Sequence, residues 1–233
     1  MQLKTLKYIF IPFISLFFSI SLQGKGKDST KVEIVMVNLS EQEAPVFGGV
    51  SLSADLVGVV MKALKSDYAQ MEVAARLNFK EKYFPVFEMG YGSCDYEGAE
   101  SGNTFKTQAP YFRIGMDYNF TKKWWKGNRL YAGVRYAFSS YQYDISSPRF
   151  SDPVWETECP FVYKDLKGTS HWGEVVFGIE TRIWKFFHLG WNVRYKFLFS
   201  EKGSSIGNPW YIPGFGKFGT SGLGGTFNII FDI

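Results

Sequence analysis

Apolar and polar residues alternate with a period of two in eight segments between Val50 and the end of the chain. A period of two places successive side chains on opposite faces of a β-strand, so each segment predicts a strand with one apolar and one polar face. In one segment, for example, Phe112 and Ile114 alternate with Arg113 and Gly115. The eight predicted strands cover residues 50–56, 69–79, 87–92, 112–120, 130–139, 174–183, 187–199 and 223–233.

The apolar faces are too bulky to line the inside of a barrel of eight strands. Such a barrel has room for only a modest filling of side chains, whereas the apolar faces carry many aromatic rings besides Leu, Ile and Val. The polar faces include small residues such as Gly90, Gly115 and Gly178, which suit a crowded inner side. We therefore predict apolar residues outside and polar residues inside, the pattern of a transmembrane β-barrel, which must close because an open edge in lipid leaves backbone groups unpaired.

The predicted connections alternate between short and long, as in an up-and-down barrel whose turns face the periplasm and whose loops face outward. Short turns lie at residues 81–83 and 184–186, a moderate one lies at 121–128, and long connections cover 93–109, 142–170 and 200–219. The first connection, near residues 62–67, is short and breaks this alternation. Aromatic residues expected to form an interfacial girdle at the short-turn end are Trp124, Trp125, Trp184, Phe186 and Phe187. The sequence thus predicts an all-β fold, an eight-stranded antiparallel up-and-down transmembrane β-barrel.

Residues 1–24 have the pattern of a secretory signal peptide, because Lys4 and Lys7 precede an apolar run of 15 residues and no acidic residue is present. The run is shorter than the about 20 apolar residues that a membrane-spanning helix needs. We expect export, a periplasmic N-terminal segment at residues 25–45 and an outer-membrane barrel domain at residues 46–233 in a Gram-negative bacterium.

The composition narrows the classes of function. With 45% hydrophobic and 21% charged residues, two Cys and two His, the chain fits neither a disordered protein nor a disulfide framework, and a His-rich metal centre is disfavoured. Removing the two lysines of the signal peptide from 26 basic residues leaves 24 against 22 acidic ones, a net charge of +2. This near-neutral balance argues against nucleic acid as a partner. No phosphate-binding glycine motif is present, and we predict no cofactor.

The chain resembles the small eight-stranded outer-membrane barrels over residues 46–233. The resemblance is carried by the signal peptide, by "FGGVSLSADLVG" in the first strand and by the closing "GTFNIIFDI", which is similar to the terminal strand recognised during insertion but ends in Ile233 instead of an aromatic residue. These features are similar to an uncharacterised outer-membrane barrel family of Bacteroidota, a domain of unknown function. The resemblance implies outer-membrane lipid and the barrel-assembly machinery as partners and implies no activity.

The inward faces carry seven acidic and six basic residues. Buried charges need compensation, so we predict that they pair across neighbouring strands and plug the lumen; a selective water pore is the alternative. The acidic residues are Asp55, Glu72, Glu88, Asp117, Glu174, Glu180 and Asp232, and the basic residues are Arg76, Arg113, Arg135, Arg182, Arg194 and Lys196.

The sequence gives few indications of a catalytic site. His171 near Ser170 and Glu174 is the candidate for an acyltransferase or deacylase site, although His171 and Glu174 are three residues apart, which in a regular strand places them on opposite faces. In an oxidising compartment Cys94 and Cys159 either form a disulfide that ties a loop to the barrel rim or remain free thiols.

These observations leave three functions open. The first is a non-enzymatic, plugged outer-membrane barrel that binds an extracellular ligand through its long loops or supports envelope integrity; the alternatives are a lipid-modifying enzyme and a narrow channel. The aromatic loop residues expected to form a recognition surface are Tyr141, Tyr143, Trp155, Phe161, Trp210, Tyr211 and Phe215.

Overall fold

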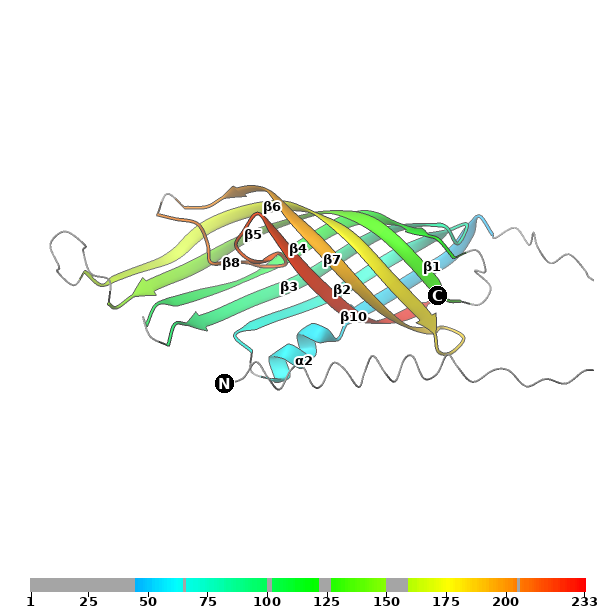
Figure 1. Ribbon diagram of the computed structural model, residues 1–233, viewed down its shortest axis with the longest axis horizontal. Helices are drawn as coiled ribbons and strands as arrows, with labels where there is room; N and C mark the ends of the chain where they lie inside the picture. Colours follow the sequence, from blue (N-terminus) through cyan, green and yellow to red (C-terminus); the bar gives the residue numbers. More distant parts are fainter. Residues whose placement is uncertain (1–44, 65, 100–101, 122–126, 150–158, 205) are drawn as a thin grey trace, which may run out of the picture. The chain divides into compact units, whose positions relative to one another are not determined.

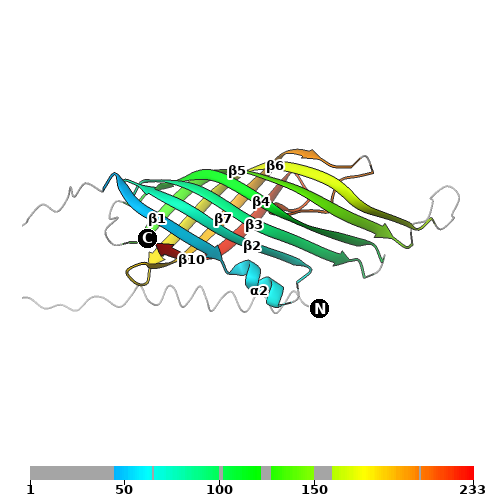
Figure 2. The same ribbon diagram turned by 180° about the vertical axis from the view of Figure 1, so that it is seen from behind.

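Eight strands form a closed antiparallel barrel in which the last strand pairs with the first (Figures 1 and 2). The computed structural model describes residues 45–233 except 65, 100–101, 122–126, 150–158 and 205. The barrel strands are β1 (Phe47–Asp55), β2 (Tyr68–Phe79), β3 (Tyr83–Glu97), β4 (Thr104–Asn119), β5 (Arg129–Ser147), β6 (Phe161–Arg182), β7 (Phe187–Lys202) and β10 (Ser221–Asp232). The predicted eight-stranded, antiparallel, up-and-down barrel is confirmed.

Two small elements interrupt the simple meander. The helix α2 (Val57–Ala63) follows β1, and a hairpin of β8 (Tyr211–Ile212) and β9 (Gly216–Lys217) lies between β7 and β10. Gly58 of α2 lies so close to β2 that a Cβ atom there would be 1.2 Å from the carbonyl oxygen of Gln70, so only glycine fits. The sequence pattern predicted neither element. Within the described residues, no helix has the length and apolar character needed to cross a membrane.

The two faces of the barrel wall differ as predicted over most of its height. Outward side chains are large, apolar and exposed; Ile114 and Val134 are each 61% exposed and Phe177 is 51% exposed. We call this band the apolar belt. Its members include Leu52, Met71, Val73, Phe87, Met89, Tyr91, Ile114, Met116, Val134, Tyr136, Val175, Phe177, Ile179, Trp191, Val193 and Tyr195. The inward face is crowded, because a Cβ atom on Gly178 would lie 2.4 Å from the ring of Tyr131.

Four strands extend well beyond the positions predicted for them, as Figure 1 shows for β3 to β6. The predicted connections 93–109 and 142–170 were therefore too long, since the strands leave only residues 98–103 and 148–160 between them. In this extension the polarity of the wall inverts: Asp95 and Lys106 are exposed on the outside, whereas Cys94 and Phe105 are buried inside. The alternation therefore continues with opposite polarity. A prediction that expects apolar residues only on the outer face misses these parts of the strands.

The two ends of the barrel are different. The end with residues 98–103, 148–160 and 203–220 is called the loop end, and the end with the β2–β3 and β6–β7 turns is called the turn end. At the turn end Trp184 and Phe186 are 68% and 53% exposed and stack with ring centroids 6.4 Å apart, while Phe187 is half-buried.

Several residues discussed above lie outside the described part of the chain. These are Trp124, Trp125 and Trp155, the predicted signal peptide at residues 1–24 and residues 25–44 of the predicted periplasmic segment.

Candidate functional site

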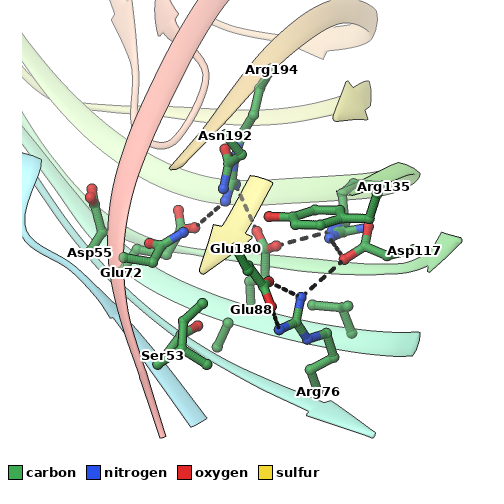
Figure 3. Close-up of a pocket in the computed structure, with 15 residues that line it drawn as sticks. Ser53, Asp55, Glu72, Arg76, Glu88, Asp117, Arg135, Glu180, Asn192 and Arg194 are labelled. Carbon is green, nitrogen blue, oxygen red and sulfur yellow. Dashed lines mark hydrogen bonds and ion pairs between the residues drawn. The ribbon is translucent and has the colours of Figure 1, made fainter. Parts of the chain in front are cut away.

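Charged side chains from six strands, β2 to β7, meet inside the barrel (Figure 3). Of the thirteen charged residues predicted to face inward, eleven are buried at no more than 8% exposure, and Asp232 is half-buried. Their inward orientation follows from the alternation of side chains along each strand. Arg182, the last residue of β6, is instead exposed at the turn end.

Two arginines organise the part of the network nearest the loop end. Arg113 of β4 is ion-paired with Glu72 of β2, and its Nε donates to Oε1 of Glu174 at 2.8 Å. Arg194 of β7 donates to Oε2 of Glu88 at 2.7 Å and to Oε1 of Glu72 at 2.8 Å. Every one of these side chains is buried, so the ion pairs compensate charges that would otherwise be costly to remove from water.

A second group lies closer to the turn end. The guanidinium of Arg135 contacts both oxygens of Asp117, at 2.8 and 2.9 Å, and its Nε donates to Glu88 at 3.0 Å. Arg76 forms two hydrogen bonds to Glu180, one of them from Nη2 to Oε2 at 2.7 Å. Two-point contacts of this kind fix the orientation of both partners. Because Arg76 on β2 reaches Glu180 on β6, the network crosses the lumen and is more than the set of neighbouring-strand ladders that the sequence predicted.

Asp232, predicted to face inward, gathers three partners at the turn end. Its Oδ2 lies 3.0 Å from Nη2 of Arg129 and 3.2 Å from Nε2 of His188, and its Oδ1 accepts a hydrogen bond from Oγ of Ser51 at 2.6 Å. The carboxylate stands between the serine and the histidine. This order does not match a catalytic triad, in which the histidine contacts the serine directly.

Arg129 was missed in the sequence because it adjoins a predicted connection. It shares the inward phase of Tyr131 and Arg135, so extending the predicted strand by one residue would have included it. Asp55 also differs from the predicted ion-pair pattern, since its Oδ1 accepts backbone N–H bonds from Val57 at 3.0 Å and Phe227 at 3.1 Å.

The β8–β9 hairpin closes the lumen above the charges. The carbonyl oxygen of Gly214, at its tip, accepts hydrogen bonds from Nη2 of Arg113 at 3.0 Å and from Nζ of Lys196 at 2.7 Å. The Lys196 ammonium also donates to the carbonyl of Phe215 at 3.1 Å. The network thus holds the hairpin by charged donors.

An aromatic cluster surrounds this hairpin and forms the apolar core of the loop end. Its buried members are Cys94, Phe105, Ala109, Tyr111, Ala137, Tyr141, Tyr143, Trp172, Tyr211, Ile212 and Phe215. Trp172 connects the cluster to the charges, because its ring packs edge-on against Phe215 and its Nε1 donates to Glu174 at 2.7 Å.

The aromatic residues that the sequence assigned to an exposed recognition surface are therefore divided. Tyr141, Tyr143, Tyr211 and Phe215 are at most 5% exposed, so their predicted role as surface residues is wrong. They face inward on the strand extensions and on the hairpin, where apolar contacts replace the charges found lower in the barrel. Among the other described members, Phe161 is half-buried and Trp210 is 46% exposed.

The candidate catalytic residues do not meet. His171 lies on the outer face, where its Nδ1 is 2.8 Å from the hydroxyl of Tyr136. Ser170 and Glu174 are buried on the inner face. The structure therefore assembles no nucleophile and base from these three residues.

The two cysteines are also separate. Cys94 is buried in the aromatic cluster, Cys159 is exposed, and both are free thiols. The disulfide alternative is not realised in this structure.

The network leaves little space inside the barrel. The cavity between the charged groups, lined among others by Asp55, Arg76, Glu88, Asp117 and Arg194, has a volume of about 30 Å³. A water molecule needs roughly 10–15 Å³ of such volume. Among the described residues, no group of three or more His, Cys, Asp or Glu side chains is placed to hold a metal ion.

Comparisons with other proteins give a family and no relative of known activity. Neither a curated protein nor a solved structure matches the chain. A family model does match, over residues 5–233, and its description is a domain of unknown function. Because the match covers nearly the whole sequence, the chain belongs to the DUF6048 family.

Proposed function

We propose that the protein is a non-enzymatic outer-membrane β-barrel with a plugged interior whose loop end binds an extracellular ligand. The observation that carries the proposal is the combination of an exposed apolar belt outside with a buried charge network inside. A water-soluble barrel would bury its apolar face, whereas a barrel in lipid exposes that face and keeps polar groups within.

The height of the belt supports a membrane location. The belt ends where the polarity of the wall inverts. Tyr91 is 47% exposed on the outside of β3, and four residues further along the same face the exposed residue is Asp95. An outward surface that is apolar only within a limited band fits the thickness of a bilayer, with the strand extensions standing in water. Trp184 and Phe186 then lie where an aromatic girdle is expected at the opposite boundary.

The interior favours a plug over a channel. Arg76, Arg113 and Arg194 reach acidic partners on other strands, and the β8–β9 hairpin fills the lumen at the loop end. The space left between the charges is comparable to that of two or three water molecules. A conducting pore would need this network to separate.

The lipid-modifying alternative has no support from the geometry, because His171 faces outward while Ser170 and Glu174 face inward. We propose further that the members of this family are small outer-membrane barrels of Gram-negative bacteria such as Bacteroidota. Export would use the signal peptide at residues 1–24, and insertion would use the barrel-assembly machinery.

Cell fractionation combined with bilayer recording tests this proposal. We expect the native chain to co-sediment with outer-membrane markers, to migrate faster on gels when unheated, and to give no single-channel conductance in planar bilayers. Recovery in the soluble fraction would contradict the location, and steady ion conductance by the wild-type protein would contradict the plug.

A further inference from the structure

A cavity of about 570 Å³ opens at the loop end, between the ends of β3, β4 and β5 and the segment that carries β8 and β9. We call it the outer pocket; its defining residues are Tyr96, Asn103, Asn208, Trp210, Lys217 and Phe218. Small-molecule sites typically measure roughly 300–1,000 Å³ and combine apolar walls with a few polar groups. The outer pocket has this size and this mixture.

Aromatic rings form the wall of the outer pocket. Tyr96 and Trp210 stack with ring centroids 5.6 Å apart and an interplanar angle of 19°. Trp210 and Phe218 remain 46% and 38% exposed, and the N–H of Phe218 donates to the carbonyl of Trp210 at 3.0 Å, so the two residues are held side by side. Exposed aromatic rings backed by other rings provide flat apolar surfaces of the kind against which the C–H face of a sugar ring packs.

The polar groups complement such a ligand. The amide of Asn208 offers a donor group and an acceptor group, as the hydroxyls of a sugar require. Oδ1 of Asn103 accepts a hydrogen bond from Oγ of Ser147 at 2.6 Å, which fixes this amide in the pocket wall. Lys217 is the single charged side chain among the described residues lining the pocket, and its Nζ lies 5.4 Å from the ring centroid of Trp210. A lone cation without a carboxylate nearby in the lining favours a neutral or anionic ligand over a cationic one.

The pocket wall is fixed from inside the barrel. Trp210 directly precedes the β8–β9 hairpin and Lys217 is its last residue, and the hairpin tip accepts hydrogen bonds from Arg113 and Lys196. A wall held in place by buried charged groups loses little freedom when a ligand binds, and this raises affinity.

We propose that the outer pocket binds an oligosaccharide that contains an acidic sugar. Its ring stacks on Trp210 and Phe218, its hydroxyls bond to Asn208, and its carboxylate lies at Lys217. The inference rests on the proposed function, because this pocket meets extracellular glycans only when the loop end faces out of the cell.

The test uses the full mature chain, refolded in detergent micelles, on a printed array of defined neutral and acidic oligosaccharides, followed by calorimetric titration with the strongest acidic hit. We expect Trp210→Ala to weaken binding by about tenfold or more, as removal of a central tryptophan typically does. Lys217→Gln should weaken binding of the acidic hit more than binding of its neutral, carboxyl-reduced analogue. The matched control Trp184→Ala removes another exposed tryptophan, at the turn end, and should bind as the wild type does.

Phe218→Ala serves as a second variant in case Trp210→Ala does not recover heat-modifiable folding. Absence of array binding by the wild type, or equal binding by the wild type and a folded pocket variant, would overturn the inference. Binding by the purified chain but not by intact cells that produce it would support the pocket and contradict the outward orientation. The two proposals therefore fail in distinguishable ways.

Discussion

At the scale of single residues, two basic side chains on β4 contribute very differently to stability. Arg113 is 1% exposed and bonded to three glutamates and a backbone carbonyl, so its removal takes a partner from each of these buried acidic groups. Lys106, on the extension of the same strand, forms a 3.2 Å ion pair with Asp95 in which both side chains are largely exposed. Solvent screens that pair and makes it weak.

Arg113→Met is therefore expected to lower the free energy of unfolding by about 3–5 kcal/mol, the range found when one partner of a buried ion pair is removed. Lys106→Met, the control on the same strand, should change it by less than about 1 kcal/mol. Urea titration of both variants in lipid vesicles measures the difference. Equal small effects would show that the interior charges are hydrated, and the plug would then be untenable.

Outward residues of β5 allow a second comparison between belt and extension. Val134 lies in the apolar belt, whereas Gln142 faces outward beyond it. Val134→Arg should destabilise the barrel by roughly 2 to 4 kcal/mol in a bilayer, since that is the cost of a basic residue near the middle of the membrane. Gln142→Arg should be close to neutral in the same vesicles. If the two variants unfold at the same urea concentration, the belt is not in contact with lipid.

At the scale of elements, the β8–β9 hairpin is the element that closes the barrel interior at the loop end. Two-residue strands would not persist alone; the hairpin is held by Arg113 and Lys196 below and by aromatic rings around it. It covers Cys94, which is 2% exposed, whereas Cys159 is exposed.

Replacing residues 210–217 by a short Gly-Ser linker should uncover this thiol. In the wild type we expect a maleimide to label one cysteine per chain rapidly, Cys159, because Cys94 is enclosed by the aromatic cluster. The linker variant should label at both, as judged by mass spectrometry of the folded protein. Rapid labelling of Cys94 in the wild type, or continued protection in the variant, would count against the hairpin as the cover.

The sequence was sufficient for the faces of the strands and insufficient for their ends. Alternation around Arg113 and Arg135 placed these residues inside, because a period of two needs no tertiary information. The prediction of strand ends failed beyond Gly92, where the inward positions become apolar and the outward ones polar. With the two faces exchanged, the pattern no longer matches the expected one and the predicted strand ends too early. The hairpin was out of reach for another reason: its position depends on contacts with residues about 100 positions away, such as Arg113.

At the scale of the whole molecule, the protein is a barrel with two different interiors. Charges fill the part within the apolar belt, and aromatic rings fill the part that extends past it. The outer surface changes in the opposite sense at the same level. Both changes have one physical cause if the belt lies in lipid. Within the bilayer apolar groups face outward, whereas in the extension, which is in water, apolar groups must be buried inside.

A flotation experiment on the refolded chain from residue 25 onward, without the predicted signal peptide, tests most directly whether the apolar belt lies in lipid. The chain is diluted from urea into buffer with or without lipid vesicles and centrifuged through a density gradient. We predict that folded, heat-modifiable protein floats with the vesicles and that the chain aggregates when no lipid or detergent is present. A folded, monodisperse chain in plain buffer would contradict the account.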